Sequence, residues 1–154
     1  MSHLSFHSPV GELTLFEEDG TIVSLDWGGV PDGKETPVLV RARDQLDAYF
    51  DGSLQAFDLP MKPLGTTFQR KVWEALCRIP YGEIRRYGEL AAEIGSAPRA
   101  IGGACGRNPI PILIPCHRVV AGNGGLGGYS GWDGIETKRF LLGLEGVAGY
   151  KQEE

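Results

Sequence analysis

The chain has 154 residues, of which 42% are hydrophobic, enough to bury the core of one domain or of two small ones. Its formal net charge of −5 excludes a uniformly basic surface. The charge is uneven, however: residues 1–65 sum to −7, residues 66–118 to +4 and residues 119–154 to −2. Because association with a polyanion depends on local charge more than on the total, the middle block can still face one.

Cysteine content and hydropathy exclude further classes of protein. Cys77, Cys105 and Cys116 cannot all pair with one another, and no C-x-x-C motif is present. We therefore expect free thiols in a reducing compartment, with no metal site and no cofactor. The sequence has no apolar run long enough to cross a bilayer and no secretory signal pattern, so we expect a cytoplasmic protein with no membrane partner.

Residues 1–58 have the pattern of a small α+β scaffold domain. Apolar and polar residues alternate in three short runs separated by turn residues, which predicts three antiparallel strands in a meander. Thr36-Pro37 then predicts the start of a helix and Gly52 its end, because Pro favours the first turn and Gly follows the last. The apolar stripe of this helix consists of Leu39, Ala42, Leu46, Tyr49 and Phe50.

The rest of the chain predicts a second, mainly helical domain. Residues 59–65 are rich in Pro and Gly, which predicts a linker. We expect the domain to span residues 66–148 and a tail to span residues 149–154. Its first helix begins with the capping-box pattern of Thr66 and Gln69 and ends before Pro80. Further helices are predicted over 87–94, 98–107 and 136–144, the last with Phe140, Leu141 and Leu144 facing inward. The helices over 87–94 and 98–107 fit a helix-turn-helix.

The helix predicted over 98–107 is small along one side, where it carries Ala100, Gly102, Gly103, Ala104 and Gly106. Close packing against another helix is the usual reason for such a stripe. Alternatively, a helix without side chains can enter the minor groove of DNA, which is only about 6 Å wide. Arg99 would then insert into the base stack or contact a phosphate, whereas its simpler role is that of a solvated surface charge.

Residues 108–118 combine three prolines with Ile110, Ile112, Leu113 and Ile114. The prolines exclude a helix and favour extended geometry, and the apolar residues predict burial. We therefore expect a buried extended segment that places Cys116 and His117 at its end. A cysteine beside an imidazole is a candidate nucleophile, although a buried structural cysteine is the commoner case.

The residues after this segment offer two further signals. Residues 122–127 match G-x-G-x-x-G, but more glycines follow in place of a helix, so we reject a dinucleotide site. Such a loop can bring its backbone close to a flat ligand. Glu145 is predicted at the end of the last helix, before the cap Gly146, where a carboxylate is unfavourable without a partner. His117 is an available partner, and a solvated Glu145 is the alternative.

Pro115-Cys116-His117-Arg118 is preceded by Asn108-Pro109-Ile110-Pro111 and followed by Gly128-Tyr129-Ser130-Gly131. Together these segments resemble the active-site region of the O6-alkylguanine-DNA alkyltransferases (methylated-DNA–protein-cysteine methyltransferases). The likeness is strong over residues 66–146, where it includes Arg99-Ala100-Ile101-Gly102-Gly103 and Leu144-Glu145-Gly146. Residues 1–58 are similar in layout only.

The resemblance implies an α+β fold with an N-terminal RNase H-like domain of three antiparallel strands and one helix, followed by a mainly α, winged-helix-like domain. It implies direct-reversal DNA repair, in which an alkyl group passes irreversibly from O6-alkylguanine in DNA to Cys116. Each molecule then acts once, as a suicide methyltransferase without a cofactor. The implied partner is double-stranded DNA, bound in the minor groove by a monomer with the damaged base flipped out. In a bacterium the protein would associate with the nucleoid.

The resemblance also assigns roles to individual residues. Glu145 holds His117, which removes the thiol proton of Cys116 through a water molecule. Tyr87 helps to rotate the nucleotide and protonates the leaving guanine, and Asn108 braces the segment that carries Cys116. The residues that line the base pocket are Pro111, Val119, Tyr129 and Ser130.

The DNA-contacting residues implied by the resemblance are Arg99, which fills the vacated base stack, and Ala100, Gly102, Gly103 and Arg86. Arg86 departs from the usual pattern, because relatives carry serine there. The arginine loses a helix cap worth about 1 kcal/mol and adds to Arg85 a second positive charge beside the DNA. Trp132-Asp133 is expected at the lip of the pocket, where it would influence which alkyl groups enter.

Three other functions stay open at this point. A binding module could flip damaged guanine without transfer, but such proteins carry another residue, typically tryptophan, in place of Cys116. A cysteine hydrolase could use Cys116 and His117 for multiple turnovers. A transcription factor could use the helix-turn-helix, although no effector or dimerisation domain follows it. The acceptance of larger alkyl groups or O4-alkylthymine, the fate of the alkylated protein and cooperative binding along DNA are not determined by the sequence.

Overall fold

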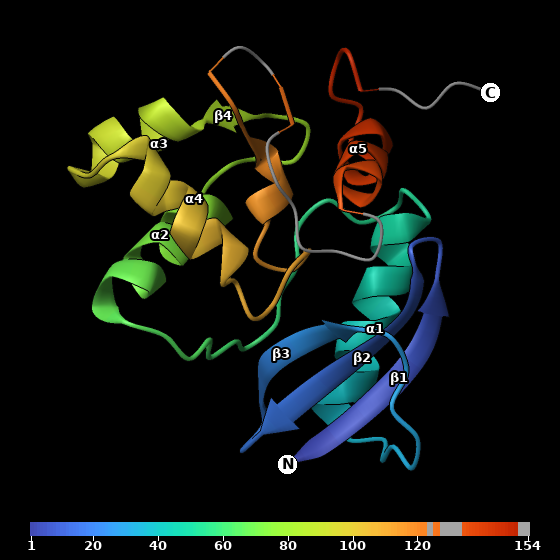
Figure 1. Ribbon diagram of the computed structural model, residues 1–154. Coiled ribbons are helices and arrows are strands. Elements are labelled where there is room, and N and C mark those ends of the chain that lie inside the picture. Colours follow the sequence, from blue (N-terminus) through green and yellow to red (C-terminus); the bar gives the residue numbers. More distant parts are fainter. Residues whose placement is uncertain (123–124, 127–133, 151–154) are drawn as a thin grey trace. The chain divides into compact units, whose positions relative to one another are not determined.

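The structure is a computed structural model that describes residues 1–122, 125–126 and 134–150 (Figure 1). The chain forms two compact units, one from residue 1 to 64 and the other from residue 65 onward. In the described part, no helix is both long and apolar enough to span a membrane.

The first unit is a three-stranded antiparallel sheet with one helix against it, as predicted (Figure 1). Strands β1 (Ser2–Ser8), β2 (Gly11–Glu18) and β3 (Thr21–Trp27) follow one another in the order β1-β2-β3. Leu13 and Leu15 of β2 are fully buried and point to the same face of the sheet. Residues 60–62, within the segment expected to be a linker, continue this sheet: Ile22 exchanges backbone hydrogen bonds with Pro60 and Lys62.

Helix α1 (Pro37–Phe50) begins where Thr36-Pro37 predicts it. The Thr36 hydroxyl accepts a hydrogen bond from the N–H of Leu39, so the cap satisfies one of the free donors of the first turn. The apolar stripe predicted from the sequence is buried at Leu39, Ala42, Leu46 and Tyr49, and Phe50 is half-buried. This stripe fixes the helix on the sheet.

The described part of the second unit contains four α-helices: α2 (Thr67–Cys77), α3 (Tyr87–Ile94), α4 (Pro98–Gly106) and α5 (Ile135–Leu144). The capping box of α2 is present, since the Thr66 side chain accepts from the Gln69 N–H and the Gln69 side chain accepts from the Thr66 N–H. Gly95, with φ of +82°, ends α3 and begins the turn of the predicted helix-turn-helix. Figure 1 shows α2, α3 and α4 gathered together.

Two short strands give this unit a feature that the sequence pattern did not predict. Strand β4 (Arg85–Arg86) pairs in parallel with β5 (Val119–Val120), so the approach to α3 is hydrogen-bonded to the residues just after Cys116. Val120 of β5 belongs to a buried hydrophobic cluster with Leu126, Leu142 and Val147, and Ile84 and Tyr150 pack against this cluster. Tyr150, expected in the tail, thus packs on the unit.

The segment over 108–118 is largely buried, as predicted, but the prediction that its backbone is extended throughout was wrong. Pro111 and Ile114 flank a tight turn, in which the Ile114 N–H donates to the carbonyl of Ile110 at 2.9 Å. Ile112 in this turn has φ of +72°, a left-handed conformation that strains a β-branched residue by about 1–3 kcal/mol. Prolines exclude a helix but do not exclude such a turn, which leads into the short 3₁₀ helix η1 (Cys116–Arg118).

The inward face of α5 also differs from the prediction. Leu141 is buried, but Phe140 and Leu144 are only half-buried. The other buried residues of the helix are Thr137, Lys138 and Leu142. The helix is therefore rotated to turn a lysine toward the interior, and its cap is Glu145, followed by Gly146 with φ of +77°.

Candidate active site

Cys116 lies in the interior of the second unit, with 6% of its surface exposed. Its N–H donates to the carbonyl of Ile114 at 2.8 Å, so the preceding turn sets its position. Asn108 holds that turn from both sides, because its Nδ2 donates to the carbonyl of Ile114 and its Oδ1 accepts from the N–H of Ile110, each at 2.9 Å. The bracing contacts expected of Asn108 are thus present.

His117 and Glu145 form the pair that the sequence analysis anticipated. The Nε2 atom of His117 lies 2.7 Å from Oε2 of Glu145, and both side chains are fully buried. Since a carboxylate only accepts hydrogen bonds, Nε2 carries the proton and donates it. In the neutral ring Nδ1 is therefore the basic nitrogen, and it has no hydrogen-bond partner among the residues that the structure describes.

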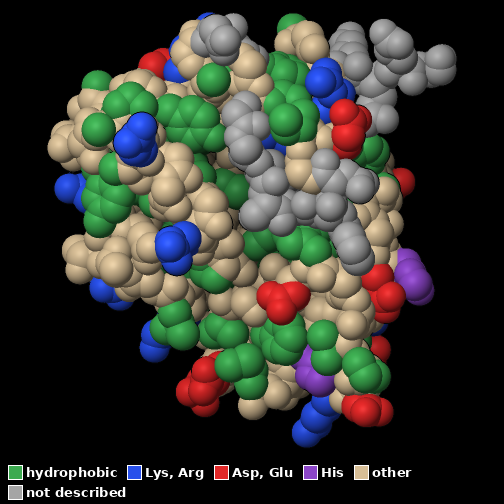
Figure 2. Space-filling view, viewed as in Figure 1, with side chains coloured by type: hydrophobic (Ala, Val, Ile, Leu, Met, Phe, Trp, Pro, Cys, Tyr) green, Lys and Arg blue, Asp and Glu red, His purple; other side chains and the backbone are tan. Residues whose placement is uncertain are grey.

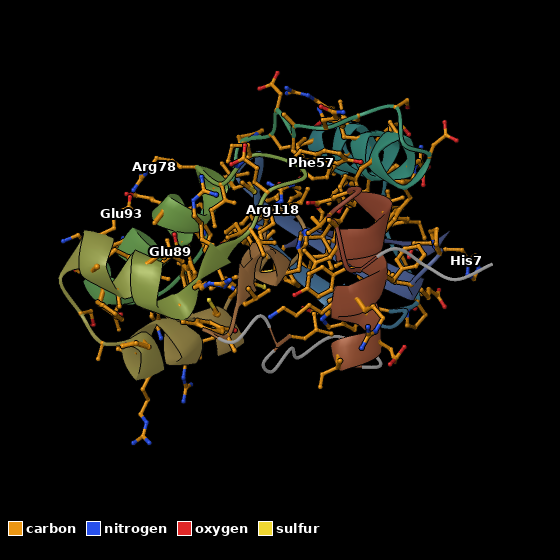
Figure 3. The ribbon with its side chains drawn as sticks, turned by 90° about the horizontal axis from the view of Figure 1, so that it is seen from above. His7, Phe57, Arg78, Glu89, Glu93 and Arg118 are labelled. Atoms are coloured by element: carbon orange, nitrogen blue, oxygen red, sulfur yellow. The ribbon has the colours of Figure 1, made fainter. Side chains whose placement is uncertain are left out.

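Arg118 completes this arrangement. Its Nε donates to Oε1 of Glu145 at 2.8 Å and its Nη2 donates to Oε2 at 3.0 Å, a fork that matches the geometry of the carboxylate. Its Nη1 donates to the carbonyl of Ile79, just after α2, at 2.7 Å. Figure 3 shows Arg118, the last residue of η1, in the middle of the view, whereas Arg78 and Glu93 lie at the edge of the unit. One buried carboxylate thus joins η1, α5 and the end of α2.

Burial and charge together determine the protonation of these groups. Burial alone would raise the pKa of Glu145, but its hydrogen bonds with His117 and Arg118 and the positive charge of Arg118 lower it to about 2. Burial lowers the pKa of His117 despite its bond to Glu145. Burial also raises the pKa of Cys116, against a hydrogen bond with Asn108 and the charge of Lys138. At neutral pH the site therefore holds a thiol, a neutral imidazole and a carboxylate.

Of Tyr87 and the predicted pocket residues, the structure describes Tyr87, Pro111 and Val119. Tyr87 is the first residue of α3, and burial, with the nearby thiols of Cys105 and Cys116, raises its pKa to about 12, so the phenol keeps its proton. Pro111, which precedes η1 in the sequence, and Val119, which follows it, are both buried. Tyr129, Ser130 and Trp132-Asp133 lie outside the described residues.

The residues expected to contact DNA lie on α4 and, for Arg86, just before α3. Arg99 and Gly103 are exposed, and Ala100 and Gly102 are half-buried. A Cβ added at Gly102, Gly103 or Gly106 would meet no atom within 4 Å, so close helix packing does not account for these glycines. Over this part of the molecule, Figure 2 shows Lys and Arg side chains standing apart from one another among hydrophobic side chains and tan surface. The face of α4 that carries these glycines is thus not covered by another part of the described unit.

Arg86, also expected to contact DNA, is exposed at the N-cap of α3 and makes no side-chain cap bond. The Glu89 side chain instead accepts from the Arg86 N–H at 2.9 Å. The side-chain cap that a serine would give α3 is therefore absent, as predicted, and the arginine side chain is exposed to solvent.

Reasoning from the residues missed two site residues: Arg118 enters it only as part of the Pro115–Arg118 motif, and Lys138 is not singled out. Lys138 interrupts the apolar positions of α5 at a spacing of three and four residues from Leu141 and Leu142. A charged residue in a buried stripe is uncommon and could have identified it. Arg118 gave no comparable signal, because its partner Glu145 is 27 residues away.

Comparison with known proteins covers nearly the whole chain. Residues 1–63 match the model of the 6-O-methylguanine DNA methyltransferase ribonuclease-like domain, and residues 67–147 match that of the DNA binding domain of the same proteins. The chain belongs to the 6-O-methylguanine DNA methyltransferase family. The RNase H-like and helix-turn-helix layout expected from the sequence is confirmed.

Individual relatives in this family are similar over their full length. The chain is 45% identical to the constitutive methylated-DNA–protein-cysteine methyltransferase of Bacillus subtilis, over 95% of each chain. It is 46% identical to the methylated-DNA–protein-cysteine methyltransferase of Methanosarcina acetivorans, over 95% of this chain and 99% of that one. The structure of Mycobacterium tuberculosis OGT in complex with DNA superposes with a TM-score of 0.85 at 44% identity, covering 93% of this chain and 91% of that one.

The Glu145 pair generates a prediction for stability. Replacing Glu145 by Gln leaves Arg118 buried without its counter-charge, so we expect the free energy of unfolding at pH 7 to fall by about 3–5 kcal/mol. Because the pKa of Glu145 is lowered from 4.5 to about 2, its contribution is complete above pH 4.5 and is lost as the pH falls toward 2. Chemical denaturation between pH 2 and pH 7 measures both effects.

The matched control is Glu93→Gln, which removes an exposed carboxylate 3.6 Å from Arg78 in the same unit. Exposed pairs contribute about 0–1 kcal/mol, so this variant should follow the wild-type curve. A Glu145→Gln variant whose acid dependence is as steep as that of the wild type would contradict the assignment.

Proposed function

We propose that this protein repairs alkylated DNA by direct reversal, transferring an alkyl group from O6 of guanine to its own Cys116. Membership of the family supports the reaction, and the observation that carries the assignment to Cys116 is the buried thiol beside the His117–Glu145 pair. The product is a thioether, which water does not cleave under ordinary conditions. Each molecule therefore acts once.

The proposed reaction begins with activation of the thiol. His117 is neutral with Nδ1 unprotonated, so it can accept the proton of Cys116, through one water molecule. Glu145 stabilises the imidazolium that results, and Arg118 keeps Glu145 ionised and in place. The relay is needed because the thiol is protonated at rest.

The transfer itself is an in-line displacement. A sulfur lone pair of the Cys116 thiolate forms the new bond to the alkyl carbon as the bond from that carbon to O6 breaks. The electron pair of the broken bond goes to the guanine, which takes a proton from the Tyr87 hydroxyl. The raised pKa of Tyr87 keeps this proton available until charge develops on the base. Tyr129 and Ser130 are proposed to border the base, with Pro111 and the carbonyls of Cys116 and Val119.

We propose that the protein reaches this base by docking α4 in the minor groove and flipping the guanine out of the helix. The open face at Gly102 and Gly103 supports this, because neither glycine is needed for packing within the unit. Arg99 is exposed at the start of α4, where it can fill the gap left in the base stack, and Arg86 adds charge beside the phosphates. The site of action is the compartment that holds the DNA.

All the groups of this mechanism come from one chain, so a monomer is proposed to act. The described site residues belong to α3, η1, β5, α5 and the segment before η1, all within the second unit. No residue of a second copy is needed for any step.

The intact mass of the protein tests the reaction. After incubation with duplex DNA that contains O6-methylguanine, we expect one added methyl group, about 14 Da, which peptide mapping places on Cys116. The matched control is Cys116→Ser, which should bind the DNA and gain no mass. An unchanged mass of the wild-type protein would indicate a binding module, and repeated turnover of an ester or amide would indicate a hydrolase.

The docking of α4 makes a separate prediction. A Cβ at position 103 would meet no atom within 4 Å in the free protein, and Gly103→Leu replaces a helical glycine, so we expect its stability to rise by up to about 1 kcal/mol. The new side chain occupies the space proposed for the groove, so the rate of methyl transfer from duplex DNA should fall by about tenfold or more, which is 1.4 kcal/mol of lost binding. Single-turnover kinetics and thermal unfolding measure the two effects.

The control for this variant is Ala92→Leu, which adds the same kind of side chain at an exposed position of α3. It should transfer methyl at the wild-type rate. A Gly103→Leu variant that is folded and transfers at the wild-type rate would contradict the docking of this face.

A further inference from the structure

Lys138 is a buried charge that the mechanism above does not use. Its side chain, on the second turn of α5, is fully buried. Its Nζ has no hydrogen-bond partner among the residues that the structure describes. An ammonium group removed from water without hydrogen bonds destabilises a fold, and an apolar side chain would pack at the same position without that cost.

The surroundings of Lys138 are the groups of the candidate active site. Nζ lies 5.7 Å from the centre of the Tyr87 ring on α3. The positive charge lowers the pKa of both nearby thiols, Cys116 in η1 and Cys105 in α4, although burial raises each more strongly. In return, burial lowers the pKa of Lys138 while the two thiols raise it. Lys138 is thus within electrostatic reach of the sulfur that is proposed to react.

The other charged groups near Cys116 are already paired. Glu145 on α5 is bound by Arg118 and His117 of η1, so its negative charge is compensated by the guanidinium. Asn108 and Tyr87 contribute only neutral dipoles. Within the part of the site that the structure describes, Lys138 is therefore the positive charge without a carboxylate partner. A thiolate at Cys116 would supply the missing counter-charge.

We propose that Lys138 is a positioning residue that stabilises the Cys116 thiolate electrostatically during alkyl transfer. The proposal deepens the proposed function and rests on it for the identity of the substrate. Lys138 keeps its own proton throughout: the thiol proton goes to His117, the sulfur forms the bond to carbon, and guanine leaves with the electron pair of the broken bond to O6. The lysine favours the step in which negative charge resides on sulfur, because opposite charges attract strongly in a buried site.

The test compares Lys138→Met with the wild-type protein in two assays. The first measures the rate of iodoacetamide labelling of Cys116 against pH, resolved by peptide mass spectrometry, in the absence of DNA. The second measures single-turnover methyl transfer from O6-methylguanine DNA at pH 7.5. We expect the labelling midpoint to rise by about one pH unit or more and transfer to slow by about tenfold, since one pKa unit changes the thiolate fraction tenfold. The melting temperature should be equal or higher, because an unpaired buried charge is removed.

Three further variants separate charge from packing. Arg139→Met removes a positive charge from the exposed side of the same helix, where solvent and salt screen it, and should leave the midpoint and the transfer rate unchanged. Lys138→Arg retains the charge and should keep the midpoint closer to the wild type than Lys138→Met does. Lys138→Gln has no charge and should behave like Lys138→Met.

Several results would overturn the proposal. A Lys138→Met protein with the wild-type labelling midpoint would show that the charge does not act on Cys116. Failure of both the Met and Gln variants to fold, or a lower melting temperature with an unchanged pH profile, would show a structural role instead. If the wild-type protein gained no methyl group while the midpoint still shifted in Lys138→Met, the proposed function would fail and the role of Lys138 would stand.

Discussion

The second unit depends on one buried carboxylate. Glu145 lies at the end of α5, and its two oxygens accept hydrogen bonds from His117 and from the fork of Arg118. Removing one partner from a buried pair of this kind costs about 3–5 kcal/mol, so α5 and η1 are held together firmly. The same bonds select the protonation of His117 and leave Nδ1 as its basic nitrogen. One interaction thus stabilises the unit and prepares the imidazole for its proposed role.

Two features of the second unit, the conformation of Ile112 and the burial of Lys138, lower its stability. Ile112 adopts a left-handed conformation that suits glycine better, within a turn held by Asn108. Lys138 is buried without a hydrogen bond among the described residues. Both features lie next to the proposed nucleophile, and neither would be expected in a fold selected for stability alone. They are consistent with a site in which the placement of one sulfur takes precedence over local stability.

Much of the fold could be predicted because its signals are local. Thr36-Pro37, the Thr66–Gln69 capping box and Gly95 mark helix ends through contacts within a few residues, and α3 begins and ends where predicted. The turn at Ile112 could not be predicted, because prolines restrict the backbone without distinguishing an extended segment from a tight turn. Arg118 was missed for a related reason: its partner is distant in sequence, and only the fold brings it to Glu145. The rotation of α5 likewise depends on packing around Lys138 rather than on its apolar pattern.

The central claim, that Glu145 holds a neutral His117 with Nδ1 free to act as a base, can be measured directly. The nitrogen-15 chemical shifts of the His117 ring report which nitrogen carries the proton and whether the ring is charged. Between pH 6.5 and 8 we expect a neutral ring protonated at Nε2, because burial lowers the pKa of His117 below its ordinary value of 6.5. A charged ring at pH 7.5, or a neutral ring protonated at Nδ1, would contradict the account.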